Sequence, residues 1–490
     1  MTILQAAARG ILWNMLFGVG ARVLQLVGTL ILTRFISPGD YGAVLAVSLT
    51  IVIVGTLTSF AFGQYLIVRQ PGPEVAFQAM VIHTLLGIVT MAVVLAMTSP
   101  LSGWLEIPEF SRYALGFAIA HVIERVRYVP ERLLIRELRF RTVATINGSS
   151  ELVFTVVAVG CAMRYGANAI LYATLARAIF STALVMKFSP RANWWRVSKL
   201  HPQTARDLLS YGIPIMLASI SDRAATRLDS LVISKLFGTS VMAPYNLAYS
   251  MAEMPINNIA EHIGEVLMPS FSRMQPAERE PAVLHAAELM AFMVAPLGVG
   301  LSATASTIVS SFFDSRWSLM APMLTILSIM TVFRPLTWPA VAYLQAESKT
   351  QLVMTLSLAR AVMVLVLVIV FGLLGGPLWS CVGACIGYAL HSVGTIVATG
   401  AATGLRTRRY LARATRPLLA CLPMYVTVVL LGEFLRSSGS PGLLTLIAQI
   451  AGGGVIYLAA SWLFARSTLL GTIDMARVAL LKRSKPPAVS

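Results

Sequence analysis

Long apolar runs recur along this chain and are separated by short polar connections. Each run is long enough to cross the ~30 Å hydrocarbon core of a bilayer as an α-helix. The fourteen runs lie at about 11–32, 43–62, 78–99, 113–130, 145–163, 168–187, 208–236, 243–269, 284–307, 319–343, 352–373, 378–400, 417–435 and 442–465. No connection is long enough to hold a soluble domain. The pattern therefore predicts an all-α polytopic membrane protein with about 14 transmembrane helices.

The basic residues gather in stretches that fall between or after these runs. The densest stretches are 125–141, 187–206, 406–416 and 466–485. With a cytoplasmic N-terminus, all four lie on the cytoplasmic side, as the positive-inside rule requires. The formal net charge of +17 is therefore a sign of topology and of contact with anionic membrane lipids. Nucleic acid is not an expected partner.

Composition excludes an ordinary soluble protein, because 57% of the residues are hydrophobic and only 12% are charged. The cysteines all lie in apolar runs and indicate neither a disulfide nor a metal site. No nucleotide-binding glycine loop, metal-ligand spacing or catalytic nucleophile motif is present. We therefore expect no enzyme activity, no metal and no cofactor, with H⁺ or Na⁺ as candidate coupling ions.

An imperfect internal repeat links the first and seventh runs. The segment ARVLQLVGTLILTRFISPGDYG (21–42) is echoed by DRAATRLDSLVISKLFGTSVMA from Asp222, at an offset of 201 residues. The offset places Arg22 on Arg223. A charge at the bilayer centre costs about 2.5–3.5 kcal/mol even on insertion scales, so a repeated arginine indicates function. Because six helices separate the repeats, the two halves are predicted to be parallel.

This repeat divides the chain into two six-helix lobes around a central cavity, followed by two further helices. Residues 187–207 form either an amphipathic linker on the cytoplasmic surface or a simple charged loop that fixes topology. The predicted divisions are 1–186 (N-lobe), 187–207 (linker), 208–400 (C-lobe), 401–466 (helices 13 and 14) and 467–490 (basic cytoplasmic tail).

The seventh predicted helix has one broad polar face. Its charged members are Asp222, Arg223, Arg227 and Asp229. Such a face must meet protein or water, because lipid does not satisfy polar groups. It either forms structural ion pairs with neighbouring helices or lines a substrate path.

The eighth predicted helix carries polar and aromatic residues at four-residue spacing, which places them on one face. They are Tyr245, Tyr249, Glu253, Asn257, Glu261 and Glu265. The carboxylates need partners, and Arg223 and Arg227 on the preceding helix are natural candidates. Alternatively, one glutamate binds a proton or Na⁺ as a coupling site.

Arginines at mid-depth in both lobes would create a positive cavity. Arg22 and Arg223 are the repeated pair, and Arg334 lies in a proline-bent tenth run where it could reach the same space. A guanidinium stays charged and binds phosphate oxygens in a fork geometry. The cavity therefore suits a phosphate or pyrophosphate. Arg177 and Arg360 are either packing partners or cavity residues.

Three stretches resemble the polysaccharide flippases, a branch of the multidrug/oligosaccharidyl-lipid/polysaccharide exporter superfamily. LTRFISPGDYG (32–42) resembles the first-loop signature, and PERLLIRELRFRTVA (130–144) resembles the loop between helices four and five. RLDSLVISKLFGTSVMAPYNLA (227–248) resembles the seventh-helix pattern. The chain is also similar to lipid II flippases, whose first-helix arginine matches Arg22. Gly28 and Thr29 stand where those proteins carry an Arg-Asp pair.

The resemblance implies a bacterial inner-membrane flippase with cytoplasmic termini, which moves a polyprenyl-pyrophosphate-linked oligosaccharide for exopolysaccharide or O-antigen assembly. In this hypothesis the arginines hold the pyrophosphate, while Tyr249 and Asn257 contact sugar. A polysaccharide polymerase and other assembly proteins are candidate partners. The alternatives are a multidrug or cation antiporter of the same superfamily, or a membrane enzyme of the same pathway, either a polymerase or an acyltransferase.

Overall fold

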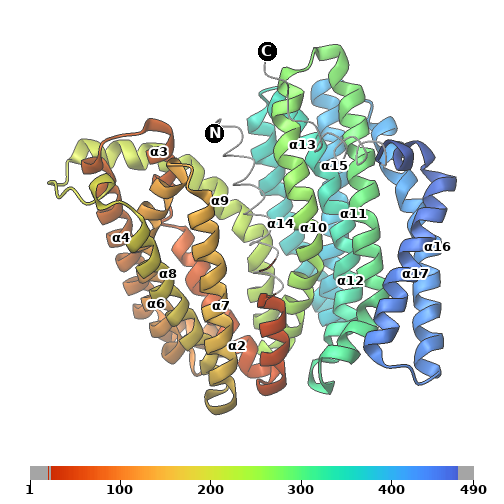
Figure 1. Cartoon of the computed structure of the whole chain (residues 1–490), viewed down its shortest axis with the longest axis horizontal. Helices are drawn as coiled ribbons and strands as arrows, with labels where there is room; N and C mark the ends of the chain where they lie inside the picture. Colours follow the sequence, from red (N-terminus) through yellow and green to blue (C-terminus); the bar gives the residue numbers. More distant parts are fainter. Residues whose placement is uncertain (1–19, 21–23, 473–490) are drawn as a thin grey trace, which may run out of the picture. The chain divides into compact units, whose positions relative to one another are not determined.

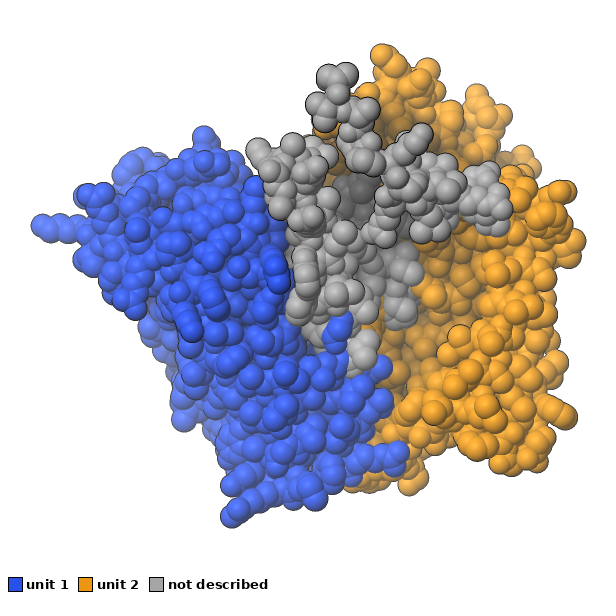
Figure 2. Space-filling view, in the orientation of Figure 1, with its two compact units in different colours: residues 1–243 blue, residues 244–490 orange. Residues whose placement is uncertain are grey.

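The computed structural model describes residue 20 and residues 24–472, and these form nineteen helices and no strand. The chain divides into two compact units, residues 1–243 and residues 244–490 (Figure 2). The prediction of an all-α membrane fold is confirmed.

The first unit, residues 1–243, contains nine of the helices given for the described residues, together with the start of a tenth (Figure 1). They are α2 (Pro38–Thr56), α3 (Phe62–Arg69), α4 (Pro73–Ala96), α5 (Thr98–Leu105), α6 (Phe110–Arg136), α7 (Phe140–Tyr165), α8 (Asn168–Phe188), the 3-10 helix η1 (Arg191–Asn193) and α9 (Pro202–Phe237).

The second unit begins within α10. Its elements are α10 (Thr239–Arg273), α11 (Pro276–Phe312), η2 (Ser315–Trp317), α12 (Met320–Phe333), η3 (Arg334–Thr337), α13 (Trp338–Ala346), α14 (Thr350–Gly375), α15 (Pro377–Thr403), α16 (Thr407–Ser437) and α17 (Gly442–Phe464).

Ten helices in the described part of the chain are long and apolar enough to cross a membrane. Three further predicted spans correspond to α6, α9 and α10, which are 27, 36 and 35 residues long. Charged and polar side chains interrupt their apolar runs. Most of the first predicted span, 11–32, lies outside the described residues.

Helix α9 packs against α2, α3, α4 and α5, so the compact units divide after α9. The predicted lobe boundary near residue 208 rests on the sequence repeat and stays a prediction. A close approach joins the start of α10 to α2. A Cβ on Gly42 would lie only 2.0 Å from the Thr239 carbonyl oxygen, so glycine permits this contact.

The Ser-Pro-Gly-Asp sequence at 37–40 forms the N-terminal end of helix α2. The Ser37 side chain accepts a hydrogen bond from the Asp40 backbone N–H at 3.2 Å. Pro38 occupies the first helical position, where its missing N–H costs nothing. These residues therefore cap the N-terminus of α2.

The predicted linker contains no helix after η1 until α9 begins, and it lies along α4. Trp194 is buried against apolar residues of α3, α4 and α6. Gln78 of α4 donates to the Ser198 hydroxyl at 3.2 Å, and its side-chain oxygen accepts from the His201 N–H at 3.1 Å. Arg196 pairs with Glu74 at 3.2 Å. The linker is therefore attached to the first unit, and its position on the membrane surface stays a prediction.

Candidate functional site

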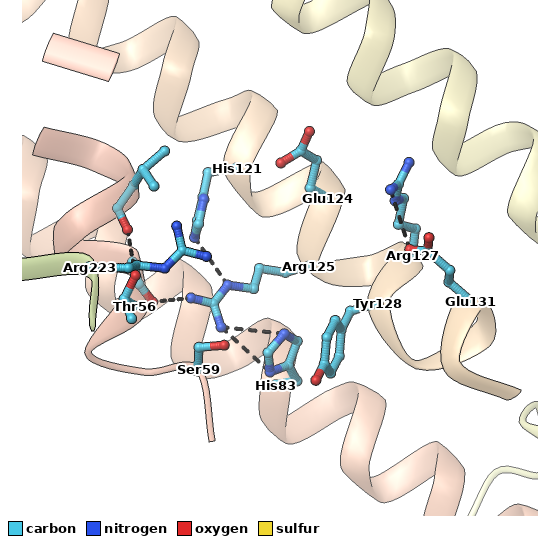
Figure 3. Close-up of a pocket in the computed structure, with 12 residues that line it drawn as sticks. Thr56, Ser59, His83, His121, Glu124, Arg125, Arg127, Tyr128, Glu131 and Arg223 are labelled. Carbon is cyan, nitrogen blue, oxygen red and sulfur yellow. Dashed lines mark hydrogen bonds and ion pairs between the residues drawn. The ribbon is translucent and has the colours of Figure 1, made fainter. Parts of the chain in front are cut away.

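A polar pocket of about 390 Å³ lies within the first unit, between α2, α4, α6 and α9 (Figure 3). Ten of its twelve lining residues have polar or charged side chains. The lining residues are Val52, Gly55, Thr56, Ser59, His83, His121, Glu124, Arg125, Arg127, Tyr128, Glu131 and Arg223.

Arg125 is the central side chain of this pocket and is only 5% exposed. Its Nε–H donates to Nε2 of His121 at 3.0 Å, and Nη1 lies 3.3 Å from a ring nitrogen of His83. Nη1 also donates to the Thr58 carbonyl at 3.1 Å, while Nη2 donates to the Thr58 hydroxyl at 3.3 Å and to the Gly55 carbonyl. Figure 3 shows the guanidinium between the two imidazole rings. Every one of these partners is neutral.

The carbonyls that hold Arg125 come from the C-terminal end of α2, which finishes at Thr56. The last carbonyls of a helix have no partner within the helix and carry the negative end of its dipole. A buried guanidinium at this place is therefore stabilised by the backbone of α2. The contact forms because α2 ends at Thr56, next to the point on α6 where the Arg125 side chain lies.

Two glycines make room for the cluster. A Cβ on Gly55 would lie 2.6 Å from the His121 ring, and a Cβ on Gly87 would lie 2.8 Å from Cγ of Arg125. Real Cβ atoms do not approach so closely without a shift of the neighbour. Gly55 of α2 and Gly87 of α4 therefore let α6 come near enough to insert its histidine and arginine.

Aromatic contacts fix the other side of the pocket. The ring of His83 stacks on Tyr128 with centroids 4.5 Å apart, and Phe62 meets His83 edge-on at 5.8 Å. His83 is 2% exposed. The imidazole is thus held by packing as well as by Arg125, so its position is well defined.

The carboxylates of the pocket are engaged by other arginines. Glu131 pairs with Arg127 at 3.3 Å, and Glu124 lies 3.9 Å from Arg177. Within the described residues, no carboxylate lies within ion-pair distance of Arg125. The pocket therefore retains an excess of positive charge.

The sequence left Arg177 with two possible roles, as a packing partner or as a cavity residue. It pairs with Glu151 at 3.1 Å, and its guanidinium lies 5.2 Å from the Phe154 ring centroid. Its ion pairs and ring contact make it a packing partner that links α8 to α7.

Most of this pocket was not predicted from the sequence. The sequence patterns singled out no histidine, and Arg125 was placed in a basic stretch on the cytoplasmic side. The side on which this stretch lies stays a prediction, but α6 continues through Arg136 and buries the Arg125 side chain inside the first unit. The spacing of His121 and Arg125 by four residues, with Tyr128 three residues further, was an available signal of one helix face.

The predicted residues of the seventh helix are only partly brought together. Arg223 lines the pocket, while Arg227 lies half-buried on α9. Asp229 is buried, and its carboxylate accepts from the Ser230 backbone N–H at 2.7 Å. Arg22 lies outside the described residues, as does the side chain of Asp222. The predicted pairing of Arg22 with Arg223 across a cavity stays a prediction.

In the second unit, Glu253 of α10 forms an ion pair with Arg334 at the start of η3. The sequence had suggested arginines of the seventh helix as the partners of Glu253. Arg334 takes that role instead, because the proline-rich segment after α12 turns its guanidinium towards α10. The side chains of Asn257, Glu261 and Glu265 lie outside the described residues.

Tyr249 is 2% exposed, and its hydroxyl lies 3.0 Å from the Tyr388 hydroxyl. The neighbouring Tyr245 is fully buried, with its ring centroid 6.2 Å from that of Tyr249. In this conformation the two rings pack within the second unit. The predicted stacking of Tyr249 on sugar would need another conformation and stays a prediction.

Comparisons of the sequence identify relatives. A family model described as "Polysaccharide biosynthesis protein" matches residues 31–322. The succinoglycan biosynthesis transport protein ExoT of Rhizobium meliloti (strain 1021) is 26% identical over 481 residues, covering 96% of each chain. The lipopolysaccharide biosynthesis protein WzxC of Escherichia coli (strain K12) is 23% identical over 450 residues, covering 89% of each.

Solved structures share the fold. The lipid II flippase MurJ in an inward closed conformation matches with a TM-score of 0.76 at 15% identity, covering 92% of this chain and 99% of that one. An inward-facing MATE family multidrug transporter of the MOP superfamily matches with a TM-score of 0.63 at 16% identity, covering 78% and 94%. The fold predicted from the superfamily resemblance is confirmed.

Proposed function

The chain belongs to the polysaccharide biosynthesis protein family, and from this premise we propose that it is a flippase for a polyprenyl-pyrophosphate-linked oligosaccharide. The substrate moves from the cytoplasmic to the periplasmic leaflet of the bacterial inner membrane. The chain acts as a transporter, not as an enzyme, and both termini lie in the cytoplasm.

The observation that carries this proposal is similarity over nearly the whole chain to proteins named for polysaccharide export and assembly. ExoT is named as a transport protein of succinoglycan biosynthesis, and WzxC as a protein of lipopolysaccharide biosynthesis. The excess positive charge of the first unit's pocket supports an anionic substrate over a cationic drug. It therefore favours a flippase over the alternative of a multidrug antiporter with the same fold.

In the proposed mechanism, alternating access exposes an arginine-lined cavity first to the cytoplasm and then to the periplasm. Arg22, Arg223, Arg227 and Arg334 hold the pyrophosphate. Arg334 would exchange its bond to Glu253 for one to phosphate. Each negative charge that moves outward gains about 2.3 kcal/mol per 100 mV of membrane potential. Potential alone can therefore drive part of the transport, with Glu253 and Glu261 as candidate sites for H⁺ or Na⁺.

The test is deletion of the gene followed by localisation of the lipid-linked oligosaccharide. We expect the intermediate to accumulate on the cytoplasmic leaflet and the full chain to restore export. A variant with Arg22→Ala and Arg223→Ala should fail to restore it, while Arg279→Gln, which alters a pair with Glu347 in the second unit, should succeed. Normal export in the deletion strain would refute the proposed function.

A further inference from the structure

The polar pocket of the first unit contains a buried charge, Arg125, that no carboxylate of the described residues neutralises. Arg125 presents five N–H donors to imidazole, hydroxyl and carbonyl groups, all of them neutral. A buried cation without a carboxylate is costly, and proteins retain such groups mainly where they serve binding or catalysis. The charge is therefore available to a ligand.

Glu131 and Glu124 of the pocket face Arg127 and Arg177, and several of the other polar side chains can donate hydrogen bonds. Because Nε2 of His121 accepts from Arg125, the neutral ring carries its hydrogen on Nδ1. The hydroxyls of Ser59 and Tyr128 can each donate as well, and Arg223 adds a second guanidinium. Donors from the turn after α2, from α6 and from α9 thus line one pocket.

The size of the pocket restricts the anion. At about 390 Å³ it is far larger than a single small ion, and it falls in the range of organic ligand sites. The positive charge of Arg125 attracts phosphate, and neutral donors around it can bind the phosphate oxygens. An anion with several oxygens, carried on a larger molecule, fits both the donors and the volume.

We propose that this pocket is a diphosphate-binding site contained within the first unit, in which Arg125 supplies the fixed charge and His121, Tyr128 and Ser59 donate to phosphate oxygens. The site deepens the proposed function and rests on it for the identity of the natural ligand. It adds a binding place to the arginines of the predicted cavity. Arg125 acts on the ligand by its charge, because its own donors remain on α2 and the imidazoles.

The first experiment measures binding of inorganic pyrophosphate to the purified full chain in phosphatidylcholine nanodiscs by calorimetry. We expect Arg125→Gln to weaken binding at least tenfold, because the variant loses the fixed positive charge that attracts the anion. Arg279→Gln, which removes a cation from the second unit, should bind as the parent chain does. Equal affinity of the parent chain and Arg125→Gln would overturn the proposal.

A second measurement does not depend on removing Arg125. Ser59→Cys is introduced into a chain whose four cysteines are alanine, and its reaction with a neutral maleimide is followed. Pyrophosphate should slow labelling at position 59 several-fold and leave Ser272→Cys, on exposed α10 surface, unaffected. Unchanged labelling of Cys at position 59 at saturating pyrophosphate would overturn the proposal.

A third arm separates the substrate from lipid headgroups, which carry similar chemistry. The pyrophosphate titration is repeated in phosphatidylglycerol nanodiscs, and we expect an affinity within twofold of that in phosphatidylcholine. Abolition of pyrophosphate binding by phosphatidylglycerol would make the pocket a headgroup site and overturn the proposal.

Failure of the site and failure of the proposed function are distinguishable. If the parent chain binds pyrophosphate through Arg125 but the deletion strain exports normally, the diphosphate site stands and the flippase proposal fails. If the deletion strain accumulates lipid-linked oligosaccharide but Arg125→Gln binds pyrophosphate as tightly as the parent, the flippase stands and the site is refuted.

Discussion

Arg125 in the first unit and Arg334 in the second are both held inside helical packing, yet their charges are balanced in different ways. Arg334 forms an ion pair with Glu253, and the two side chains are 18% and 14% exposed. Arg125 is more deeply buried, and its hydrogen-bond partners among the described residues are carbonyls, a hydroxyl and imidazole rings. The pair in the second unit is neutral overall, whereas the cluster in the first unit keeps its positive charge.

This difference separates two uses of a buried arginine. An ion pair holds helices together but gives no net attraction to a ligand until it opens. A guanidinium held by dipoles is positioned in advance and still attracts an anion. Removing a partner should therefore affect the two units very differently.

The largest effect is expected from Glu253→Ala. Removal of one member of a buried ion pair leaves an uncompensated charge and typically costs 3–5 kcal/mol. We expect a large fall in the midpoint of thermal unfolding in detergent. The double variant Glu253→Ala with Arg334→Met should recover much of the loss, and an unchanged midpoint in the single variant would show that the pair contributes no stability.

A smaller effect is expected from Arg125→Met. This change removes a charge and leaves only neutral acceptors without donors, at a cost of about 1–3 kcal/mol. The unfolding midpoint should fall less than in Glu253→Ala, measured in the same detergent. A larger fall than that of Glu253→Ala would contradict the contrast between the two arginines.

The packing around Arg125 can be tested with Gly55→Ala. The new Cβ would lie 2.6 Å from the His121 ring, so the ring must shift. Overpacking of 1–3 kcal/mol is offset in part by the better helix propensity of alanine, which leaves a net loss of about 1 kcal/mol. Gly160→Ala on α7 meets no atom within 4 Å and should instead stabilise. Equal unfolding midpoints for the two variants would show that the ring accommodates the methyl group.

The smallest effect concerns an exposed pair outside the pocket. Lys235 hydrogen-bonds Glu106 at 2.7 Å and thereby lowers the pKa of that carboxyl below its ordinary value of 4.5. A lowered folded-state pKa adds stability above 4.5 that is lost as the pH falls through the folded-state value. The pair is exposed, so the contribution is small.

Lys235→Gln should therefore lower the unfolding midpoint slightly at pH 7, and the difference from the parent chain should shrink at pH 3. A difference that grows on acidification would reverse the sign of this linkage.

Much of the fold could be predicted because the bilayer acts on each segment of the chain separately. Apolar runs of sufficient length must become helices in lipid, whatever their neighbours are. The α12–η3–α13 segment, Met320–Ala346, matches the predicted tenth span despite its proline-rich interruption. The resemblance carried by residues 32–42 and 130–144 also pointed to polysaccharide biosynthesis, the family whose model matches residues 31–322.

The site could be predicted only in part, because the sequence does not show which residues a polar side chain will contact. Arg223 was singled out by the repeat and lines the pocket, and Glu253 was expected either to pair with an arginine or to bind a coupling ion. In the structure Glu253 pairs with an arginine. That arginine is Arg334, which the proline-rich turn brings to α10. Partner choice of this kind depends on where helices cross, and no local pattern encodes it.

The sequence by itself determined a helical, multi-pass membrane protein of the polysaccharide biosynthesis family, since hydrophobic length and charged segments act locally in a bilayer. Only the tertiary structure decided that His83 of α4, His121 and Arg125 of α6 and the carbonyl end of α2 meet in one pocket. The physical reason is that Gly55 and Gly87 allow a helix approach whose consequence appears only once the helices are packed.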